Sequence, residues 1–230
     1  PHVPWGENAG YDPAALQLPP KHVDTAETRE QRARYCSDIT RADTLLGELR
    51  ALAKDKVPGD TLFIYTADHG GQWPFGKWNL YDAGIRIPFI VAWPGHLQPA
   101  STNDAMIAWP DLLPTFIELG GGTMPEGIDG KSFANVLRGT ATTHREKIFT
   151  THSGDGDFNV YPIRSVRTRD WKYIRNLHPE FQHQTHISRS SNVTSGFNYW
   201  QSWLSAAESR PEAAAILKRC SVRPAEELYD

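Results

Sequence analysis

The stretch Thr61-Leu-Phe-Ile-Tyr-Thr-Ala67, followed at once by Asp68-His69-Gly70-Gly71, decides how this chain is interpreted. Its first part is apolar, β-branched and aromatic, and a Pro-Gly-Asp turn precedes it, which predicts a strand buried on both faces. Strands of this kind belong to parallel sheets. Because open α/β sheets bind ligands at the carboxyl ends of their strands, Asp68 and His69 stand where chemistry is usually placed.

Asp68 and His69 are also suitable ligands for a metal ion. Carboxylate oxygen and imidazole nitrogen both bind divalent cations, and two adjacent ligands can leave a strand end together. An ordinary Asp-His-Gly turn, in which Asp68 accepts backbone N–H groups and His69 is exposed, explains the same residues. The short motif alone leaves both interpretations open.

Lys77 favours a binding site over a plain turn. It lies between Gly76 and Trp78, with Phe75 before it and Tyr81 soon after, so its charge is framed by aromatic side chains. A lysine in such surroundings suits an anion such as sulfate or phosphate. A second apolar strand is predicted within residues 85–95, where it ends in a Pro-Gly turn.

Composition and charge exclude some classes of function. The net charge of -3 argues against a nucleic-acid surface, which would be strongly basic. No apolar run approaches the length of a membrane span, and no signal peptide is visible. The two cysteines, far apart in the sequence, define no disulfide framework.

The remaining pattern predicts a core followed by a smaller antiparallel part. A long helix is expected after Asp24 or Thr25, with an apolar stripe that packs on the sheet. A strand is expected at 104–108, a helix at 110–119 and a strand at 147–151. Beyond it, 153–157 resembles a flexible acidic loop, and the alternating runs 163–167 and 171–175 predict a hairpin. Three histidines in a polar segment are expected at the surface, namely His178, His183 and His186.

Four motifs in this order resemble the carboxyl-terminal signature of sulfatases in the alkaline phosphatase superfamily: Asp68-His69-Gly70, Gly76-Lys77-Trp78, Asp82-Ala-Gly-Ile-Arg-Ile-Pro88 and Trp93-Pro94-Gly95. The resemblance implies an α/β fold, with part of an alkaline-phosphatase-like mixed or parallel sheet sandwiched by helices. It also implies a small antiparallel carboxyl-terminal subdomain. Residues 1–151 would belong to the α/β core and residues 152–230 to that subdomain.

The resemblance also implies roles for individual residues. Asp68 and His69 correspond to ligands of a divalent ion, expected to be Ca²⁺, and Lys77 to a contact with the substrate's sulfate. His69 replaces the asparagine of many members, which leaves the identity of the metal open. His2, in a His-x-Pro-aromatic segment, is expected to bind sulfate or protonate the leaving group, since histidine titrates near neutral pH.

Two further substrate contacts are predicted in the second half of the chain. His152 follows a strand expected to end near the pocket, although a partly exposed loop histidine would fit the same position. Arg164 in the predicted hairpin is the other candidate, and an ion-pair residue is the alternative there. Residues 151–167 resemble the heparan N-sulfatase-like bacterial members, which implies a sulfated or N-sulfated sugar, such as a glycosaminoglycan, as the substrate.

The nucleophile of this family is not found in the sequence. Members carry a Cys/Ser-x-Pro-x-Arg segment whose first residue becomes formylglycine, and neither Cys36 nor Cys220 has the required proline and arginine. The chain is therefore expected to be an internal fragment, inactive alone, with formylglycine upstream and outside it. Family members act in the periplasm, outside the cell or in lysosomes.

Two other functions remain open at this point. A phosphodiesterase or phosphonate hydrolase of the same superfamily would use the same Asp-His-Gly ligands, with an unmodified Thr or Ser nucleophile and a second metal site. A non-catalytic carbohydrate-binding remnant would retain the fold without the chemistry. The upstream sequence distinguishes these functions, because only a sulfatase needs the formylglycine motif.

Overall fold

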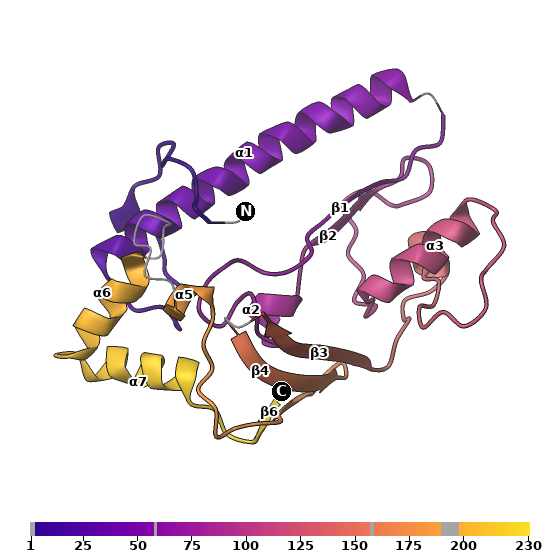
Figure 1. Cartoon of the computed structure of the whole chain (residues 1–230). Helices are drawn as coiled ribbons and strands as arrows, with labels where there is room; N and C mark the ends of the chain where they lie inside the picture. The colour runs from indigo at the N-terminus through magenta and orange to yellow at the C-terminus, as the bar shows by residue number, and fades with distance from the viewer. Residues whose placement is uncertain (1–2, 58, 157–158, 190–197) are drawn as a thin grey trace.

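The computed structural model describes residues 3–57, 59–156, 159–189 and 198–230 (Figure 1). Helices and strands alternate irregularly along the chain, and this mixed content confirms the predicted α/β class. In chain order the elements are η1 (Pro13–Ala15), α1 (Ala26–Lys56), β1 (Phe63–Thr66), α2 (Asp82–Ile85), β2 (Phe89–Ala92), η2 (Trp109–Asp111), α3 (Leu112–Leu119), α4 (Ala134–Leu137), β3 (Ile148–Asp155), β4 (Asn159–Arg167), β5 (Lys172–Asn176), α5 (His186–Arg189), α6 (Asn198–Ala207), α7 (Pro211–Ser221) and β6 (Glu226–Tyr229).

A four-stranded antiparallel sheet in the order β3-β4-β5-β6 forms the second half of the fold. It confirms the predicted hairpin. The prediction of a loop from residue 153 was wrong, because β3 continues to Asp155 past a bulge between His152 and Gly154. Polar residues extend this strand because one side of an antiparallel sheet tolerates water. The division of the chain after residue 151 stays a prediction.

The strand expected within residues 61–67 is present as β1, but its surroundings differ from the prediction. Within the described residues its neighbour is β2, which runs antiparallel to it, with Phe63 opposite Ala92 and Thr66 opposite Phe89. All four β1 side chains are half-buried rather than buried on both faces. An apolar run predicts a strand, yet it carries no information on the number or direction of its neighbours.

Helix α1 begins at its predicted cap but buries a different face. The Thr25 hydroxyl accepts a hydrogen bond from the Thr28 N–H at 3.1 Å. The predicted stripe does not pack on a sheet, since Ile39 is 40% and Leu49 56% exposed. Instead, the first half of α1 packs against η1 and α6 through small and polar side chains, and its far end extends away from them (Figure 1). Within the described residues no helix is both long and apolar enough to cross a membrane.

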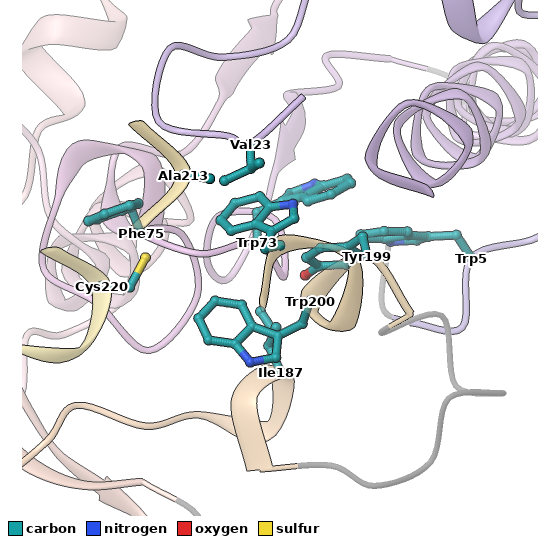
Figure 2. Packing of buried hydrophobic residues seen from close by; sticks show 10 residues of the cluster. Trp5, Val23, Trp73, Phe75, Ile187, Tyr199, Trp200, Ala213 and Cys220 are labelled. Atoms are coloured by element: carbon teal, nitrogen blue, oxygen red, sulfur yellow. The ribbon is translucent and has the colours of Figure 1, made fainter. Parts of the chain in front are cut away.

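Aromatic side chains form the main core, between the start of the chain, the loop before β2 and helices α6 and α7 (Figure 2). The Trp5 and Trp73 rings stack at 4.4 Å, and Trp73 also contacts Tyr199. Trp203 is fully buried and donates its indole N–H to the Thr28 hydroxyl at 2.7 Å. These contacts make the aromatic residues of α6 part of the protein core.

A smaller core joins the loop before β2 to the four-stranded sheet. Leu80 packs against a buried group on β4 and β5, namely Tyr161, Ile163 and Ile174. The loop 67–85 is therefore held between two cores. The strand predicted at 104–108 is absent from these described residues, which are extended without pairing before η2, whereas α3 and its end at Gly120 match the prediction.

Candidate active site

Three glycines fold the loop from Asp68 to Ile85 tightly back on itself. A Cβ on Gly70 would lie 1.8 Å from the Ala83 carbonyl oxygen, and one on Gly84 would lie 2.4 Å from the Gly76 oxygen. The Gly70 N–H in turn donates to the Gly84 oxygen at 2.8 Å. Only glycine fits such backbone contacts. This packing brings the end of β1, with Asp68 and His69, against the segment that carries Lys77.

Two residues close to Lys77, one two positions before it and one directly after it, have unusual backbone conformations. Phe75 has φ 64° and Trp78 φ 65°, in the left-handed region that non-glycine residues rarely adopt. Each such residue costs on the order of 1–3 kcal/mol and persists only where its surroundings impose it. Phe75 and Asn79 are both at least 94% buried, so packing holds this segment in place. Lys77 is thus presented by a rigid turn.

Asp68 and His69 show both the turn contacts and a possible ligand pair. Asp68 Oδ1 accepts the His69 N–H at 3.0 Å, as the turn interpretation predicts. His69 Nδ1 lies 2.8 Å from the Gly70 carbonyl oxygen, so in a neutral ring Nδ1 carries the proton and Nε2 carries the lone pair. That Nε2 lies 3.3 Å from Asp68 Oδ2. Two lone-pair atoms this close are suitably placed to bind one cation.

These two donors fit half of a metal site. The Asp68 side chain is 76% exposed, so its outer oxygen is accessible, and the His69 tautomer is the one that binds metal. Within the described part of the chain, no group of three or more His, Cys, Asp or Glu side chains could hold an ion. The pair could therefore supply two ligands of such a site, and the metal site itself stays a prediction.

The Lys77 ammonium lies beside an indole ring, and the charges of two carboxylates act on it. Its Nζ is 4.8 Å from the centroid of the Trp78 ring. Burial lowers the Lys77 pKa, whereas the charges of Asp68 and Asp155 act in the opposite direction. Asp155 comes from the end of β3, so the structure brings the four-stranded sheet to the predicted anion site.

Trp78 is itself anchored from two elements. Its indole Nε1–H donates to Asp155 Oδ2 at 2.9 Å, and the His186 ring on α5 stacks on it at 4.7 Å with an angle of 18°. His186 Nδ1 is also 3.7 Å from Asp155 Oδ2. The sequence interpretation missed both partners, since it placed Asp155 in a loop and His186 at the surface. No local signal in the sequence links residues so far apart.

Asp82 ties the same loop to the sheet. Its Oδ1 lies 2.9 Å from Arg167 Nη1 on β4 and 3.0 Å from Lys172 Nζ on β5. Lys172 is 4% exposed, so its charge is largely removed from water and depends on Asp82. The loop and the sheet are thereby joined by an ion pair as well as by the Leu80 contacts.

Two histidines lie in or against the four-stranded sheet, and His152 is part of β3 rather than following a strand as predicted. His152 Nε2 is 3.0 Å from Asn159 Nδ2, and burial lowers the His152 pKa, although Asn159 and Asp155 oppose the change. His183 was predicted at the surface, which was wrong: it is 6% exposed, and burial holds its pKa well below the usual value. Its ring packs edge-on against Tyr161 at 5.2 Å. This contact with a residue distant in the sequence keeps the His183 side chain buried.

Among the described residues, Arg164 contacts His152 but makes no hydrogen bond or ion pair with Asp68, His69 or Lys77. Arg164 lies opposite Thr151 and next to the inward-facing Ile163, so it points to the exposed side of the sheet. Its Nη1 donates to the His152 oxygen at 3.2 Å and to its neighbour's carbonyl. His2 lies outside the described residues. Both remain predictions.

Two family models match the chain over the loop and its surroundings. The sulfatase family matches residues 2–122. The family described as N-sulphoglucosamine sulphohydrolase, C-terminal, matches residues 67–185. The two matches overlap over residues 67–122, which include Asp68, His69 and Lys77.

Individual proteins agree with the family matches. An ulvan-active sulfatase of Formosa agariphila is 36% identical over 148 residues, which are 64% of this chain and 29% of that protein. A solved structure in complex with its substrate D-glucosamine-2-N,6-O-disulfate has a TM-score of 0.59 at 23% identity, covering 82% of this chain and 40% of that one. A phosphonate monoester hydrolase from Silicibacter pomeroyi has a TM-score of 0.55 at 21% identity, covering 86% and 45%. These structures share the fold, and this chain spans less than half of each protein.

Proposed function

Since this chain belongs to the sulfatase family, we propose that the intact protein hydrolyses sulfate esters or sulfamates of a sulfated sugar. One observation carries the proposal: a glycine-packed loop presents Lys77 on a rigid turn, where the charge of the Asp68 carboxylate, beside His69, acts on its ammonium. A cation, a carboxylate and an imidazole at the end of one strand suit an anionic substrate and a divalent ion.

Lys77 would bind a sulfate oxygen. Negative charge builds on the sulfate and leaving-group oxygens during hydrolysis, and a fixed ammonium stabilises that charge without reorganisation. The contacts of Trp78 with Asp155 and His186 support this role, because they fix the ring beside which Lys77 lies. Asp155 and His186 would thus orient Lys77 through this ring.

Asp68 and His69 would hold a divalent cation, Ca²⁺ on the family resemblance. When bound, such an ion polarises the sulfate group as a Lewis acid. The nucleophile would be a formylglycine upstream of this chain, and His2 would protonate the leaving group or bind sulfate. His152 would contact the substrate: its lowered pKa keeps the ring neutral near pH 7, and a hydrogen bond from Asn159 to Nε2 leaves Nδ1–H as a donor.

A sulfated or N-sulfated amino sugar, as in glycosaminoglycans, is the proposed substrate class. The match to the N-sulphoglucosamine sulphohydrolase family over residues 67–185 supports it, since that stretch includes His152 and the strands around it. The relative acting on ulvan and the structural neighbour bound to a disulfated glucosamine act on sulfated sugars as well.

Phosphonate or phosphodiester hydrolysis is the second candidate. A phosphonate monoester hydrolase shares the fold, and Lys77 with Asp68 and His69 would suit any tetrahedral oxyanion. Assays of the intact protein on aryl sulfate, aryl phosphonate and bis-aryl phosphate separate the two functions. Binding of sulfated sugar without turnover of any of them would instead indicate a carbohydrate-binding remnant.

The direct test is Lys77→Ala in the intact protein. Loss of one stabilising donor lowers turnover by about 10²–10³-fold, and we expect sulfatase turnover to fall by that amount with unchanged circular dichroism. Lys54→Ala on the exposed end of α1 is the matched control and should leave turnover within twofold. Unchanged turnover in Lys77→Ala would show that Lys77 does not bind the sulfate.

A further inference from the structure

The bulge in β3 sets the direction of the Asp155 side chain. In a regular strand, residues three positions apart point to opposite faces of the sheet, so His152 and Asp155 would lie on different sides. The bulge after His152 shifts the register by one residue. His152 lies opposite Ile163, and beyond the bulge Asp155 lies opposite Asn159. Ile163 and Asn159 are both buried on one face of β4, and directly opposite residues share a face, so His152 and Asp155 point to the same side.

One oxygen of the Asp155 carboxylate is held by the protein. Oδ2 accepts the Trp78 Nε1–H at 2.9 Å and lies 3.7 Å from His186 Nδ1. The Lys77 ammonium lies over the same indole, 4.8 Å from its centroid. The Trp78 ring therefore joins the carboxylate at the end of β3 to the cation of the candidate site.

The other oxygen of Asp155 is left for a ligand. Oδ1 accepts no hydrogen bond from any residue that the structure describes, and the side chain is 52% exposed. Most exposed carboxylates rotate freely, whereas the contacts of Oδ2 restrict this one. A polar group whose rotamer is fixed in this way is prepared for a partner before that partner binds.

His152 supplies the complementary group on the same side of β3. Its Nε2 is engaged with Asn159, so that Nδ1–H is the donor proposed above to contact the substrate. An ionised carboxylate oxygen only accepts hydrogen bonds. An acceptor and a donor side by side match the hydroxyl and amino groups of a sugar. A simple sulfate ester without such groups has nothing to donate to Asp155.

We propose that Asp155 is a specificity-determining residue: its Oδ1 accepts a hydrogen bond from a hydroxyl or amino group of the sugar whose sulfate Lys77 binds. This inference rests on the proposed function, because it requires the sulfate at Lys77. The two oxygens of Asp155 then have separate tasks, since Oδ2 holds Trp78 and Oδ1 contacts the sugar. A substrate without a donor leaves a negative oxygen unpaired beside its own anion and binds more weakly.

Isothermal titration calorimetry on the intact protein, produced without formylglycine so that no probe is hydrolysed, tests the proposal. The probes are glucosamine 6-sulfate, N-sulfoglucosamine and methyl sulfate, which has no hydrogen-bond donor. Asp155→Asn keeps an oxygen for the indole N–H but replaces the second oxygen by an NH₂ group. We expect the ratio of the sugar Kd to the methyl sulfate Kd to rise about tenfold or more, because a hydrogen bond to a charged group is lost.

Asp170→Asn is the matched control. It removes the same charge from the exposed turn between β4 and β5, at the opposite end of β4 from Asn159. All three Kd values should stay within twofold of the parent in this variant. A similar rise of the ratio in both variants would mean that overall charge, and not the Asp155 oxygen, sets the preference.

Each outcome decides the question. A loss confined to glucosamine 6-sulfate identifies the ammonium as the donor, and a loss for N-sulfoglucosamine identifies another group of the sugar. Equal weakening of all three probes would mean that Asp155 acts only through Lys77, and it overturns the proposal, as does an unchanged ratio or no binding of either sugar. Lys77→Ala separates this result from the proposed function: unchanged methyl sulfate binding in that variant removes the sulfate from Lys77, whereas the ratio in Asp155→Asn is measured independently.

Discussion

The indole N–H of Trp78 donates to the Asp155 carboxylate at 2.9 Å and so joins two residues 77 positions apart in the chain. Trp78 follows Lys77 directly, and the Lys77 ammonium lies beside the same indole. One hydrogen bond thus links the end of the four-stranded sheet to the predicted anion site.

Asp155→Ala should release this anchor. We expect the free energy of unfolding, measured by urea titration, to fall by about 1 kcal/mol, because the bond is charge-assisted but half-exposed. Asp155→Asn keeps an acceptor for the indole N–H and should lose less. The indole signal of Trp78 in ¹H–¹⁵N spectra should move in Asp155→Ala, and an unmoved signal would mean that the bond does not hold in solution.

Gly70→Ala should disrupt the loop. Its Cβ would lie 1.8 Å from the Ala83 oxygen, which is backbone and cannot rotate away. Overpacking of this kind costs up to about 3 kcal/mol, and we expect a loss of that size in urea unfolding. Gly47→Ala on α1 is the matched control: nothing lies within 4 Å of its Cβ, so the change should stabilise the protein by about 1 kcal/mol. A Gly70→Ala variant as stable as the parent would refute the close contact.

His22 should make stability depend on pH. Burial, with a smaller effect of Arg32, lowers its pKa to about 3. Between its unfolded value near 6.5 and pH 3, the unfolded chain binds a proton that the folded chain does not, so stability falls as pH falls, by about 1.4 kcal/mol per pH unit. His22→Phe keeps the ring contacts with Trp73 and Trp203, and should flatten this part of the profile. An equal slope in both proteins would exclude His22 as its cause.

Asp111 should contribute stability at higher pH and lose it in acid. Burial disfavours its charge, but hydrogen bonds from Arg145 and from the Lys131 and Ala108 N–H groups outweigh burial and lower its pKa. Its contribution is therefore complete above the unfolded value near 3.9 and disappears as pH falls through the lower folded value. Asp111→Asn leaves Arg145 without its partner and should cost about 3 kcal/mol at pH 7. The difference between the two proteins in urea unfolding should shrink below pH 4; a constant difference would contradict the assignment.

The secondary-structure elements that were predicted correctly are those that depend on residues close together in the sequence. The hairpin of β4 and β5, the Thr25 cap and the end of α3 each depend on a few neighbouring residues. The prediction for the face of α1 was wrong because Thr28 is buried against Trp203 of α6, far along the chain, and Ser37 against Asn8 and Ala9 of the preceding loop. The periodicity of apolar residues indicates which face of a helix they share, but it does not indicate which elements pack against that face.

The candidate site was predicted in part for the same reason. Asp68, His69 and Lys77 are close in sequence, and their motifs identified the family before any contact was known. Asp155 and His186 were missed because they contact Trp78 from β3 and α5, and the spacing of residues in the sequence does not reveal such tertiary contacts. His183 was misplaced because Tyr161, on another strand, supplies the contact that buries it.

The backbone contacts among Gly70, Gly76 and Gly84 limit how this region can evolve. An insertion or a larger residue between them would separate Lys77 from Asp68, and the Asp82 ion pair would carry the displacement into β4 and β5. Variants of this chain must therefore keep the length of this loop. Longer insertions fit better at exposed positions away from this loop, such as the far end of α1, where Leu49 and Leu52 are exposed.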